Sequence, residues 1–578
     1  MNEHKNAEES AHQMIDQWLH ANIPSYLKEQ IQTESPELIA RFMKEISFGT
    51  SGMRALMGAG MDRINEVTIA RGCWALGQYL KEIAPQAPRV VICFDNRQRS
   101  EEFALCAGRV LSALGVTVYL THKLRPVPYL SFLVRQLHTT AGIMITASHN
   151  PKEYNGLKVY DAHGGEIGEV AENAIEKYRT LLKELYPKGS NERIEYVDLE
   201  LFDEKYLKVI ETLPLMRQQN YERGDTLHII YSSLYGTGST LALRALNRCG
   251  FTRVCLVDEE CKVDPSFGKI VCPNPEDERA YDQGLKMLID QRADVLLIND
   301  ADADRVGVAI IHRGIPVILS GDEIVALCLY HLCSNLQRQG RLLKEHAVIT
   351  TLVTTRLLDA VTKYFGLSIY RVHTGFKCIA ECIDQWEKND CQHRFLFAAE
   401  ESYGFLVADY IRDKDGIAAD CLVAEMVRCA KDRGKDLIDV LYEMYEKFGV
   451  FRQKQRSIDL PSGVNTSAVA SSMMQKIRLS PPEEICGIKV NFIEDYLEGI
   501  RRKGAEIESK LALKPSDVLV LRLSDETSIV LRPSGTEPKL RIHVGVIGRG
   551  GVDVKEEIQR LDRKIEKLMG AVLDMVNR

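Results

Sequence analysis

A serine and a histidine stand on a predicted turn directly after an apolar segment. Residues 146–151 read Thr-Ala-Ser-His-Asn-Pro, and the β-branched, apolar run 141–146 that leads into them predicts a buried strand. Because a residue before proline avoids the helical region, Asn150 predicts a turn. The hydroxyl of Ser148 would be displayed at a strand end beside His149, and Lys158 follows shortly after; such a hydroxyl can accept and return a chemical group. An ordinary serine-rich turn is the alternative.

Three aspartates at alternate positions follow a second predicted buried strand, residues 293–298. Residues 299–305 read Asn-Asp-Ala-Asp-Ala-Asp-Arg. Bare carboxylates at this spacing would repel one another, but they become favourable around Mg²⁺ or Ca²⁺, which prefer oxygen ligands. An EF-hand is excluded, because its sixth and twelfth positions, counted from Asp300, hold Arg305 and Ile311 instead of Gly and Glu. The remaining alternative is a solvated acidic turn, and Arg305 favours the metal site because it can pair with a carboxylate or reach a phosphate.

Two further loops carry groups that suit phosphate and sugar hydroxyls. Residues 532–539 read Arg-Pro-Ser-Gly-Thr-Glu-Pro-Lys after the predicted strand 529–531. Arginine, hydroxyl and free backbone N–H donors in one loop bind phosphate, although a Pro-Ser-Gly turn with solvated charges would share this sequence. Residues 397–404 read Phe-Ala-Ala-Glu-Glu-Ser-Tyr-Gly, and carboxylates at a strand end can accept hydrogen bonds from a sugar. The alternative for this segment is the start of a helix.

Together the four loops resemble those of the α-D-phosphohexomutase family, and they occur in that family's order. Residues 48–54 (Phe-Gly-Thr-Ser-Gly-Met-Arg) and 374–377 (Thr-Gly-Phe-Lys) resemble two more segments of the family, so that the likeness runs from about Phe48 to about Val544. Within the family, Glu-Glu-Ser-Tyr-Gly at 400–404 is most similar to the sugar loop of the longer bacterial phosphoglucomutases, which are related to phosphopentomutases.

The resemblance implies a phosphoserine enzyme that holds one Mg²⁺ per chain and is activated by glucose 1,6-bisphosphate. The implied metal ligands are Ser148, Asp300, Asp302 and Asp304, and the implied catalytic residues are Ser148, Lys158, His149, Arg54 and Arg305. The implied substrate-binding residues are Glu400, Ser402, Lys377, Arg532, Ser534, Gly535, Thr536 and Lys539. His149 and the two arginines would neutralise the transferring group. Lys158 would be the general acid or base, with a pKa that its cationic surroundings lower.

The expected reaction is the interconversion of α-D-glucose 1-phosphate and glucose 6-phosphate through the bisphosphate. A phosphopentomutase acting on ribose or deoxyribose 1-phosphate is the alternative within the family, because the same residues would serve both. A Mg²⁺-dependent sugar phosphatase and an inactive phosphosugar-binding protein are the alternatives outside it. We interpret Asp95 and Arg97, after another predicted strand, as an ordinary surface ion pair rather than as a support for the serine loop.

Composition excludes several classes of function. The 578 residues carry a net charge of −7 and no basic stretch, so nucleic acid is not an expected partner. No apolar run approaches the ~20 residues that span a membrane, and the charged N-terminal residues 1–9 lack the apolar core of a secretion signal. The 15 cysteines are scattered singly, which is typical of a reduced, cytoplasmic protein. We expect small phosphosugars as partners and a monomer or homodimer.

The order of predicted elements is strand, turn, helix, repeated. Residues 89–92 predict a strand and 100–114 a helix, and 227–231 predict another strand with a helix after the Gly-Thr-Gly turn at 236–238. That turn is not a dinucleotide-binding fingerprint, because Leu241 stands at the third glycine position. With the resemblance, we expect an α/β fold of three related doubly wound mixed-sheet domains and a smaller C-terminal α+β domain around a central cleft. The expected boundaries are 1–220, 221–325, 326–455 and 456–578.

Overall fold

The chain forms two compact units in a computed structural model that describes residues 2–32, 35–49, 52–389, 391–459, 466–534 and 539–577. Unit 1 comprises Met1–Gly321, Ala380–Ala398 and Ser402–Arg433, and unit 2 comprises Asp322–Ile379, Ala399–Glu401 and Gly434–Arg578. Within the part of the chain that is described, no helix is long and apolar enough to cross a membrane.

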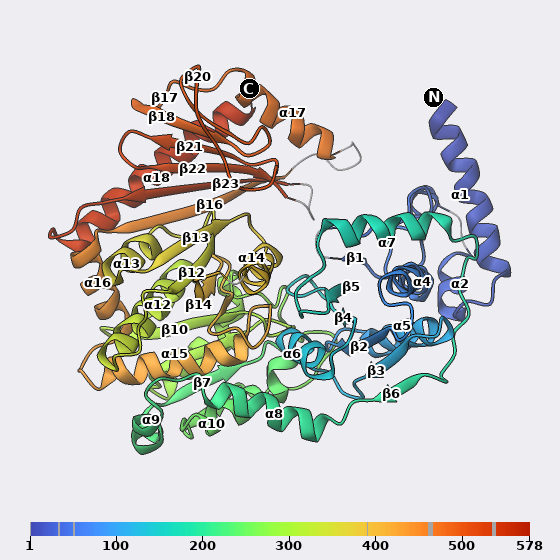
Figure 1. Cartoon of the computed structure of the whole chain (residues 1–578), viewed down its shortest axis with the longest axis horizontal. Coiled ribbons are helices and arrows are strands. Elements are labelled where there is room, and N and C mark those ends of the chain that lie inside the picture. Colours follow the sequence, from blue (N-terminus) through green and yellow to red (C-terminus); the bar gives the residue numbers. More distant parts are fainter. Residues whose placement is uncertain are drawn as a thin grey trace. The chain divides into compact units, whose positions relative to one another are not determined.

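Unit 1 begins with three helices (Figure 1). Their buried apolar residues form one core cluster with Ala59, Met61 and Val67. In this core the rings of Trp18 and Phe42 meet edge to face, with centroids 5.1 Å apart. The helices are α1 (Asn2–His20), α2 (Ser25–Gln30) and α3 (Pro36–Ala40).

The first sheet of unit 1 is mixed, with strand order β1-β5-β4-β2-β3-β6. Strands β4, β2, β3 and β6 run parallel, whereas β5 is antiparallel to both β4 and β1. The strands are β1 (Met53–Leu56), β2 (Arg89–Phe94), β3 (Thr117–Leu120), β4 (Ala141–Ile145), β5 (Tyr154–Asp161) and β6 (Ile194–Tyr196). The accompanying helices are α4 (Glu66–Ile83), α5 (Ser100–Ala113), α6 (Val127–Leu137), α7 (Glu169–Leu181), α8 (Leu199–Glu211) and α9 (Arg217–Arg223). The parallel strands β2 and β4 are buried apolar runs, as expected for strands that helices cover.

The second sheet of unit 1 has the order β11-β10-β9-β7-β8. Its central strand β9 is parallel to β7 and antiparallel to β10, so this sheet is also mixed. The strands are β7 (Ile229–Ser232), β8 (Val254–Leu256), β9 (Val295–Asn299), β10 (Val306–His312) and β11 (Ile315–Leu319). The helical segments are η1 (Gly224–Thr226), η2 (Thr237–Thr240), α10 (Ala242–Arg248), η3 (Glu278–Tyr281) and α11 (Asp282–Asp290). Helix α15 (Gly416–Lys431) packs on β9 and β10. Most of α14 (Phe376–Lys388) and β14 (Arg394–Ala399), and all of β15 (Phe405–Leu406), also belong to unit 1.

Unit 2 ends in an antiparallel sheet with the path β16-β23-β22-β21-β18-β19-β20, and β17 pairs with β18. Its strands are β16 (Phe451–Asp459), β17 (Glu484–Ile485), β18 (Ile488–Asp495), β19 (Ile500–Lys503), β20 (Glu506–Lys510), β21 (Leu519–Leu523), β22 (Ser528–Pro533) and β23 (Lys539–Ile547), with α17 (Thr466–Leu479) and α18 (Val554–Asn577). Before this sheet come α12 (Gly321–Arg338), β12 (His346–Thr351), α13 (Leu357–Phe365), β13 (Ser368–Val372) and α16 (Leu437–Phe448), and β12 and β13 pair in parallel. The mixed sheets of unit 1 and the antiparallel sheet of unit 2 confirm the expected α/β class with an α+β C-terminal part.

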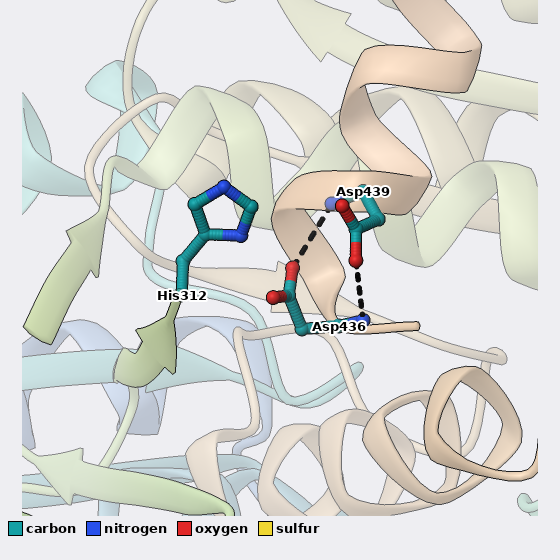
Figure 2. Close-up of side chains that lie close together, drawn as sticks. All are labelled: His312, Asp436 and Asp439. Carbon is teal, nitrogen blue, oxygen red and sulfur yellow. Dashed lines mark hydrogen bonds between the residues drawn. The ribbon is translucent and has the colours of Figure 1, made fainter. Parts of the chain in front are cut away.

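Helix α16 starts at a capping box, which Figure 2 shows. The carboxylate of Asp436 accepts a hydrogen bond from the backbone N–H of Asp439 at 3.0 Å, and that of Asp439 accepts one from the N–H of Asp436 at 3.1 Å. Two backbone donors that the helix leaves without intrahelical partners are thereby satisfied.

Candidate active site

The serine loop begins where buried strand β4 ends. Ser148 is 3% exposed and has a φ of +52°, a left-handed conformation that is uncommon for a residue other than glycine. Its backbone N–H donates to Thr146 Oγ1 at 2.8 Å, and its Oγ lies 3.3 Å from His149 Nδ1. The loop therefore holds a serine hydroxyl in one defined place, against a ring nitrogen.

The interpretation of Asp95 and Arg97 as a surface ion pair is wrong. Both side chains are 0% exposed, and Arg97 Nε lies 3.1 Å from Asp95 Oδ2. The guanidinium also donates to the backbone carbonyl of Ser148 at 2.5 Å. The pair therefore supports the serine loop from inside the first sheet.

The aspartate loop is wound tightly at the end of β9. Ala303 has a φ of +52°, and the backbone N–H groups of Asp304 and Arg305 both donate to Asp300 Oδ1 at 3.2 Å. The carboxylates of Asp300, Asp302 and Asp304 each offer one oxygen, and these oxygens all lie within 4.8 Å of one another. All three residues are buried. The alternate spacing of the three aspartates in the sequence therefore brings their carboxylate oxygens together in one group.

This carboxylate group fits a divalent cation. Within the described residues, Asp300 Oδ2, Asp302 Oδ1 and Asp304 Oδ1 are buried without a hydrogen-bond partner. Burial, together with the charges of Asp304 and Asp302, raises the pKa of Asp300 well above its usual range. A cation would remove this repulsion and bind these oxygens, and an all-oxygen donor set suits a hard ion.

Two lysines lie against the aspartates, and sequence reasoning missed the second. Lys158 Nζ is 3.5 Å from Asp302 Oδ2, and Lys414 Nζ is 3.2 Å from Asp304 Oδ2. Although burial alone would lower the pKa of Lys158, the carboxylates of Asp302, Glu166 and Asp304 outweigh burial and raise it. The expected lowered pKa assumes a cation held by these carboxylates, so for the metal-bound site it stays a prediction. The charged run Arg-Asp-Lys-Asp at 412–415, shortly after the sugar loop, was the available signal for Lys414.

The remaining candidate catalytic residues surround the same two loops. Arg54, on β1, donates through Nη1 to Asn150 Oδ1 at 3.0 Å. Arg305 Nη1 is 3.1 Å from Glu276 Oε1, and its Nε is 3.7 Å from Asp300 Oδ2. Burial and the cations Arg305, Arg54, Lys158 and Arg97 hold the pKa of His149 well below its usual range. In the unphosphorylated chain the ring of His149 meets Ser148 as a hydrogen-bond partner, and its expected role of neutralising the transferring group stays a prediction.

Hydrogen bonds join the serine loop and its sheet to the segments of the second sheet within unit 1. The backbone N–H of Val127 donates to the carbonyl of Asp302 at 2.9 Å, and Cys272 Sγ donates to the carbonyl of His149 at 2.9 Å. Asn96 Nδ2 donates to the carbonyl of Asp264 at 3.2 Å. Ser148, Lys158 and the three aspartates therefore belong to one packed unit.

The candidate sugar and phosphate groups lie mostly in unit 2. Glu400 Oε1 accepts a hydrogen bond from the N–H of Gly375 at 2.9 Å, so that its loop is tied to the Thr-Gly-Phe-Lys segment. Lys377 lies in the first turn of α14. No helix follows Glu400 directly; β15 comes next, which contradicts the alternative of a helix start. Ser402 is half-buried in unit 1.

The phosphate loop connects β22 to β23. Arg532 Nη1 donates to Thr374 Oγ1 at 2.6 Å, which joins the phosphate loop to the Thr-Gly-Phe-Lys segment within unit 2. Burial lowers the pKa of Arg532 despite the carboxylates of Glu401 and Glu400. The N–H of Ser534 donates to the carbonyl of Lys539 at 2.8 Å. The expected site residues Gly535 and Thr536 lie outside the described residues.

Three family models match consecutive parts of the chain. They are described as the α/β/α domains I, II and III of phosphoglucomutase/phosphomannomutase, and they match residues 45–184, 204–313 and 320–448. The chain belongs to the phosphoglucomutase/phosphomannomutase family. The matched models confirm the expected three α/β/α domains of an α-D-phosphohexomutase, whereas the boundaries given above stay predictions.

Curated relatives of this phosphohexomutase include the phosphoglucomutases of several Staphylococcus aureus strains. The protein of strain MSSA476 is 35% identical over 553 residues, covering 94% of this chain and 97% of that protein. The protein of strain RF122 is 35% identical over 528 residues, covering 90% and 93%.

Two solved structures show the same fold. The exocytosis-sensitive phosphoprotein parafusin, a phosphoglucomutase of Paramecium in an open form, has a TM-score of 0.67 at 16% identity, covering 92% of this chain and 96% of its own. A phosphoglucomutase/phosphomannomutase family protein of Burkholderia thailandensis has a TM-score of 0.63 at 17% identity, covering 89% and 96%.

Proposed function

We propose that this phosphohexomutase interconverts α-D-glucose 1-phosphate and glucose 6-phosphate through a phosphoserine at Ser148. The observation that carries the proposal is the packing of the Ser148 loop, Lys158 and the aspartate trio into one unit. Relatives that are 35% identical over 94% of the chain and carry the name phosphoglucomutase support the choice of reaction. The enzyme is accordingly an isomerase that acts by phosphoryl transfer.

Each half of the reaction moves one phosphoryl group. A free hydroxyl of the sugar phosphate attacks the phosphorus on Ser148; the new bond joins phosphorus to the sugar oxygen, and the bond to Ser148 Oγ breaks. The proton that the sugar hydroxyl loses ends on Ser148 Oγ, and Lys158 and Lys414 are the candidates for relaying it. In the second half, the other phosphate of the bisphosphate returns to Ser148 by the reverse steps.

Charge neutralisation is the main requirement of this transfer, since little covalent chemistry is left to the protein. Arg54 and Arg305 supply fixed positive charge around the Ser148 loop. Asp300, Asp302 and Asp304, together with Ser148, would hold one Mg²⁺ per chain, which when bound supplies positive charge to the transferring group. Glucose 1,6-bisphosphate is the proposed activator, because its loss between the two halves would leave Ser148 unphosphorylated.

The phosphate that is not transferred would bind the loop between β22 and β23. Arg532, Ser534 and Lys539 supply donors there, and Glu400 and Ser402 would hold sugar hydroxyls, with Lys377 beside them. The substrate must bind in both orientations, so one phosphate site has to accept either end of the sugar. The central cleft that would bring these groups to Ser148 stays a prediction, as do the monomer or homodimer and the cytoplasmic location.

Replacing Lys539 tests the phosphate loop. Lys539 follows the loop that would bind the phosphate, and its Nζ is 3.9 Å from Asp459 Oδ1, whose side chain is largely exposed. Because a hydrogen bond to a charged group contributes about 1.5–3 kcal/mol, we expect Lys539→Ala to raise KM for both sugar phosphates about tenfold or more. Steady-state kinetics in both directions measure this.

The matched control is Lys454→Ala. Lys454 lies on β16 of the same sheet and pairs with Glu566 at 2.8 Å. The KM of the Lys454→Ala variant for both sugar phosphates should stay at the wild-type value. A change in Lys539→Ala that is limited to the unfolding temperature would show that Lys539 is structural.

Substrate comparison tests the reaction itself. Purified chain is assayed with glucose, mannose, glucosamine and ribose 1-phosphates, with and without glucose 1,6-bisphosphate, and free phosphate is measured alongside. We expect kcat/KM to be highest for glucose 1-phosphate, with no release of phosphate. A preference for ribose 1-phosphate would identify a phosphopentomutase, and phosphate released in step with substrate loss would identify a phosphatase.

A further inference from the structure

Arg97 lies shortly after the end of β2, at the edge of the first sheet where the serine loop begins. Strands β2 and β4 are parallel neighbours with Phe94 opposite Ile145, so the segments that follow them leave the sheet side by side. Arg97 follows β2 and is 3% exposed. A buried cation at this place needs partners, because an unpaired charge in the interior is costly.

Those partners are four backbone carbonyls of the serine loop. Nη2 donates to the carbonyls of Ser148 and Asn150, each at 2.5 Å. Nη1 donates to the carbonyls of Pro151 and Tyr154, at 2.8 and 3.0 Å. One planar guanidinium therefore spans the loop from its reactive serine to the start of β5.

The guanidinium is itself held in place. Asp95 Oδ2 lies 3.1 Å from Arg97 Nε, while Asp95 Oδ1 accepts hydrogen bonds from the N–H of Arg97 at 2.9 Å and from Ser100 Oγ at 2.7 Å. The ring of Phe267 lies 5.1 Å from the guanidinium carbon. These contacts fix the plane of the guanidinium before any substrate binds.

The hydrogen bond from Arg97 to the carbonyl of Ser148 sets the orientation of the peptide group between Ser148 and His149. In a planar trans peptide the C=O and the N–H point in opposite directions. Because the carbonyl of Ser148 faces Arg97, the N–H of His149 points away from it. The same contact holds Ser148 at its left-handed φ of +52°, which costs free energy unless the surroundings enforce it.

We infer that Arg97 is the positioning residue of the phosphoryl-transfer step, fixing the backbone on which phosphorylated Ser148 is carried. This inference rests on the proposed phosphoserine reaction and adds a residue that does not touch the sugar. Lysine cannot replace this arginine, because a single ammonium cannot span four carbonyls in one plane. The consequence is specific: loss of the guanidinium should slow the transfer and leave binding of the sugar phosphate intact.

The test compares Arg97→Lys with a matched buried arginine of unit 1. Arg428 is 2% exposed, donates through Nε to Asn220 Oδ1 at 2.8 Å, and lies on α15 away from the serine loop, so that Arg428→Lys is the control. We expect Arg97→Lys to lower kcat about 100-fold, as a misplacement of ~1 Å does, with KM for glucose 1-phosphate within about threefold of wild type. The control should keep both constants. Amide hydrogen exchange of residues 146–154 should be faster in Arg97→Lys alone.

Asp95→Asn is the second variant, used if Arg97→Lys does not fold. It leaves the arginine in place but removes the charge that aims it, so that kcat should fall with KM unchanged. The inference is overturned if the folded variant keeps the kcat and loop exchange of the control, or if KM rises while kcat stays. A wild-type chain without mutase turnover would instead overturn the proposed function, and the inference with it.

Discussion

Ser148→Ala should abolish mutase turnover, lowering kcat by on the order of 10⁴-fold or more. The hydroxyl of Ser148 is the group that carries the phosphoryl in the proposed reaction, and alanine removes it without adding volume. The fold should remain, because within the described residues the Ser148 hydroxyl hydrogen-bonds only to the ring of His149. A coupled assay in the presence of glucose 1,6-bisphosphate measures the loss, and circular dichroism and thermal unfolding check the fold.

The control for this variant is Ser233→Ala. Ser233 is a fully buried serine that follows β7 in the same unit, and its hydroxyl donates to the carbonyl of Glu260 at 2.9 Å. Its removal should change kcat little, although it leaves a buried carbonyl with one donor fewer. Turnover of Ser148→Ala at the level of this control would remove Ser148 from the reaction.

Asp302→Asn should weaken the binding of Mg²⁺ and lower activity together. The amide keeps the size of the side chain but loses the charge that the cation would neutralise. Since changes outside the ligand shell already cost about 10–100-fold in metal affinity, loss of a ligand charge should cost at least as much. Titration calorimetry with Mg²⁺ measures the affinity directly, without the need for catalysis.

Asp420→Asn is the control that distinguishes the effect of losing a metal ligand from the effect of losing any buried carboxyl group. Asp420 is fully buried in the same unit and accepts a hydrogen bond from Asn299 Nδ2 at 3.3 Å, but it is not a member of the trio. Burial raises its pKa well above the usual range, and the uncharged amide keeps the size of the side chain. Its Mg²⁺ affinity should stay at the wild-type value. Equal affinities in Asp302→Asn and wild type would contradict the proposed metal site.

The strands that carry the site could be predicted from the sequence because each is a short, buried, β-branched run that ends at a polar loop. The predicted strands 141–146, 293–298 and 529–531 coincide closely with β4, β9 and β22, and the predicted helix 100–114 with α5. In each case local sequence and burial point to the same element, which is the condition under which such predictions succeed.

Contacts between segments that are distant in sequence could not be predicted. No local sequence pattern distinguishes Arg97, a buried arginine that binds the serine loop, from an arginine in a surface ion pair, because its partners lie in the loop after β4. The same holds for Lys414, which reaches Asp304 only because the backbone at Gly416 lies against the aspartate loop; a Cβ at Gly416 would be 2.7 Å from the carbonyl oxygen of Ala303.

Locating the enzyme-bound phosphoryl group tests the account most directly. Purified chain is incubated with glucose 1,6-bisphosphate and Mg²⁺, digested, and mapped by mass spectrometry; a second sample then receives an excess of unlabelled glucose 1-phosphate. We predict one phosphoryl group on the peptide that contains Ser148, and its transfer to the sugar in the second sample. A chain that turns over with Ser148 unmodified, or that carries the transferable phosphoryl on another residue, would contradict it.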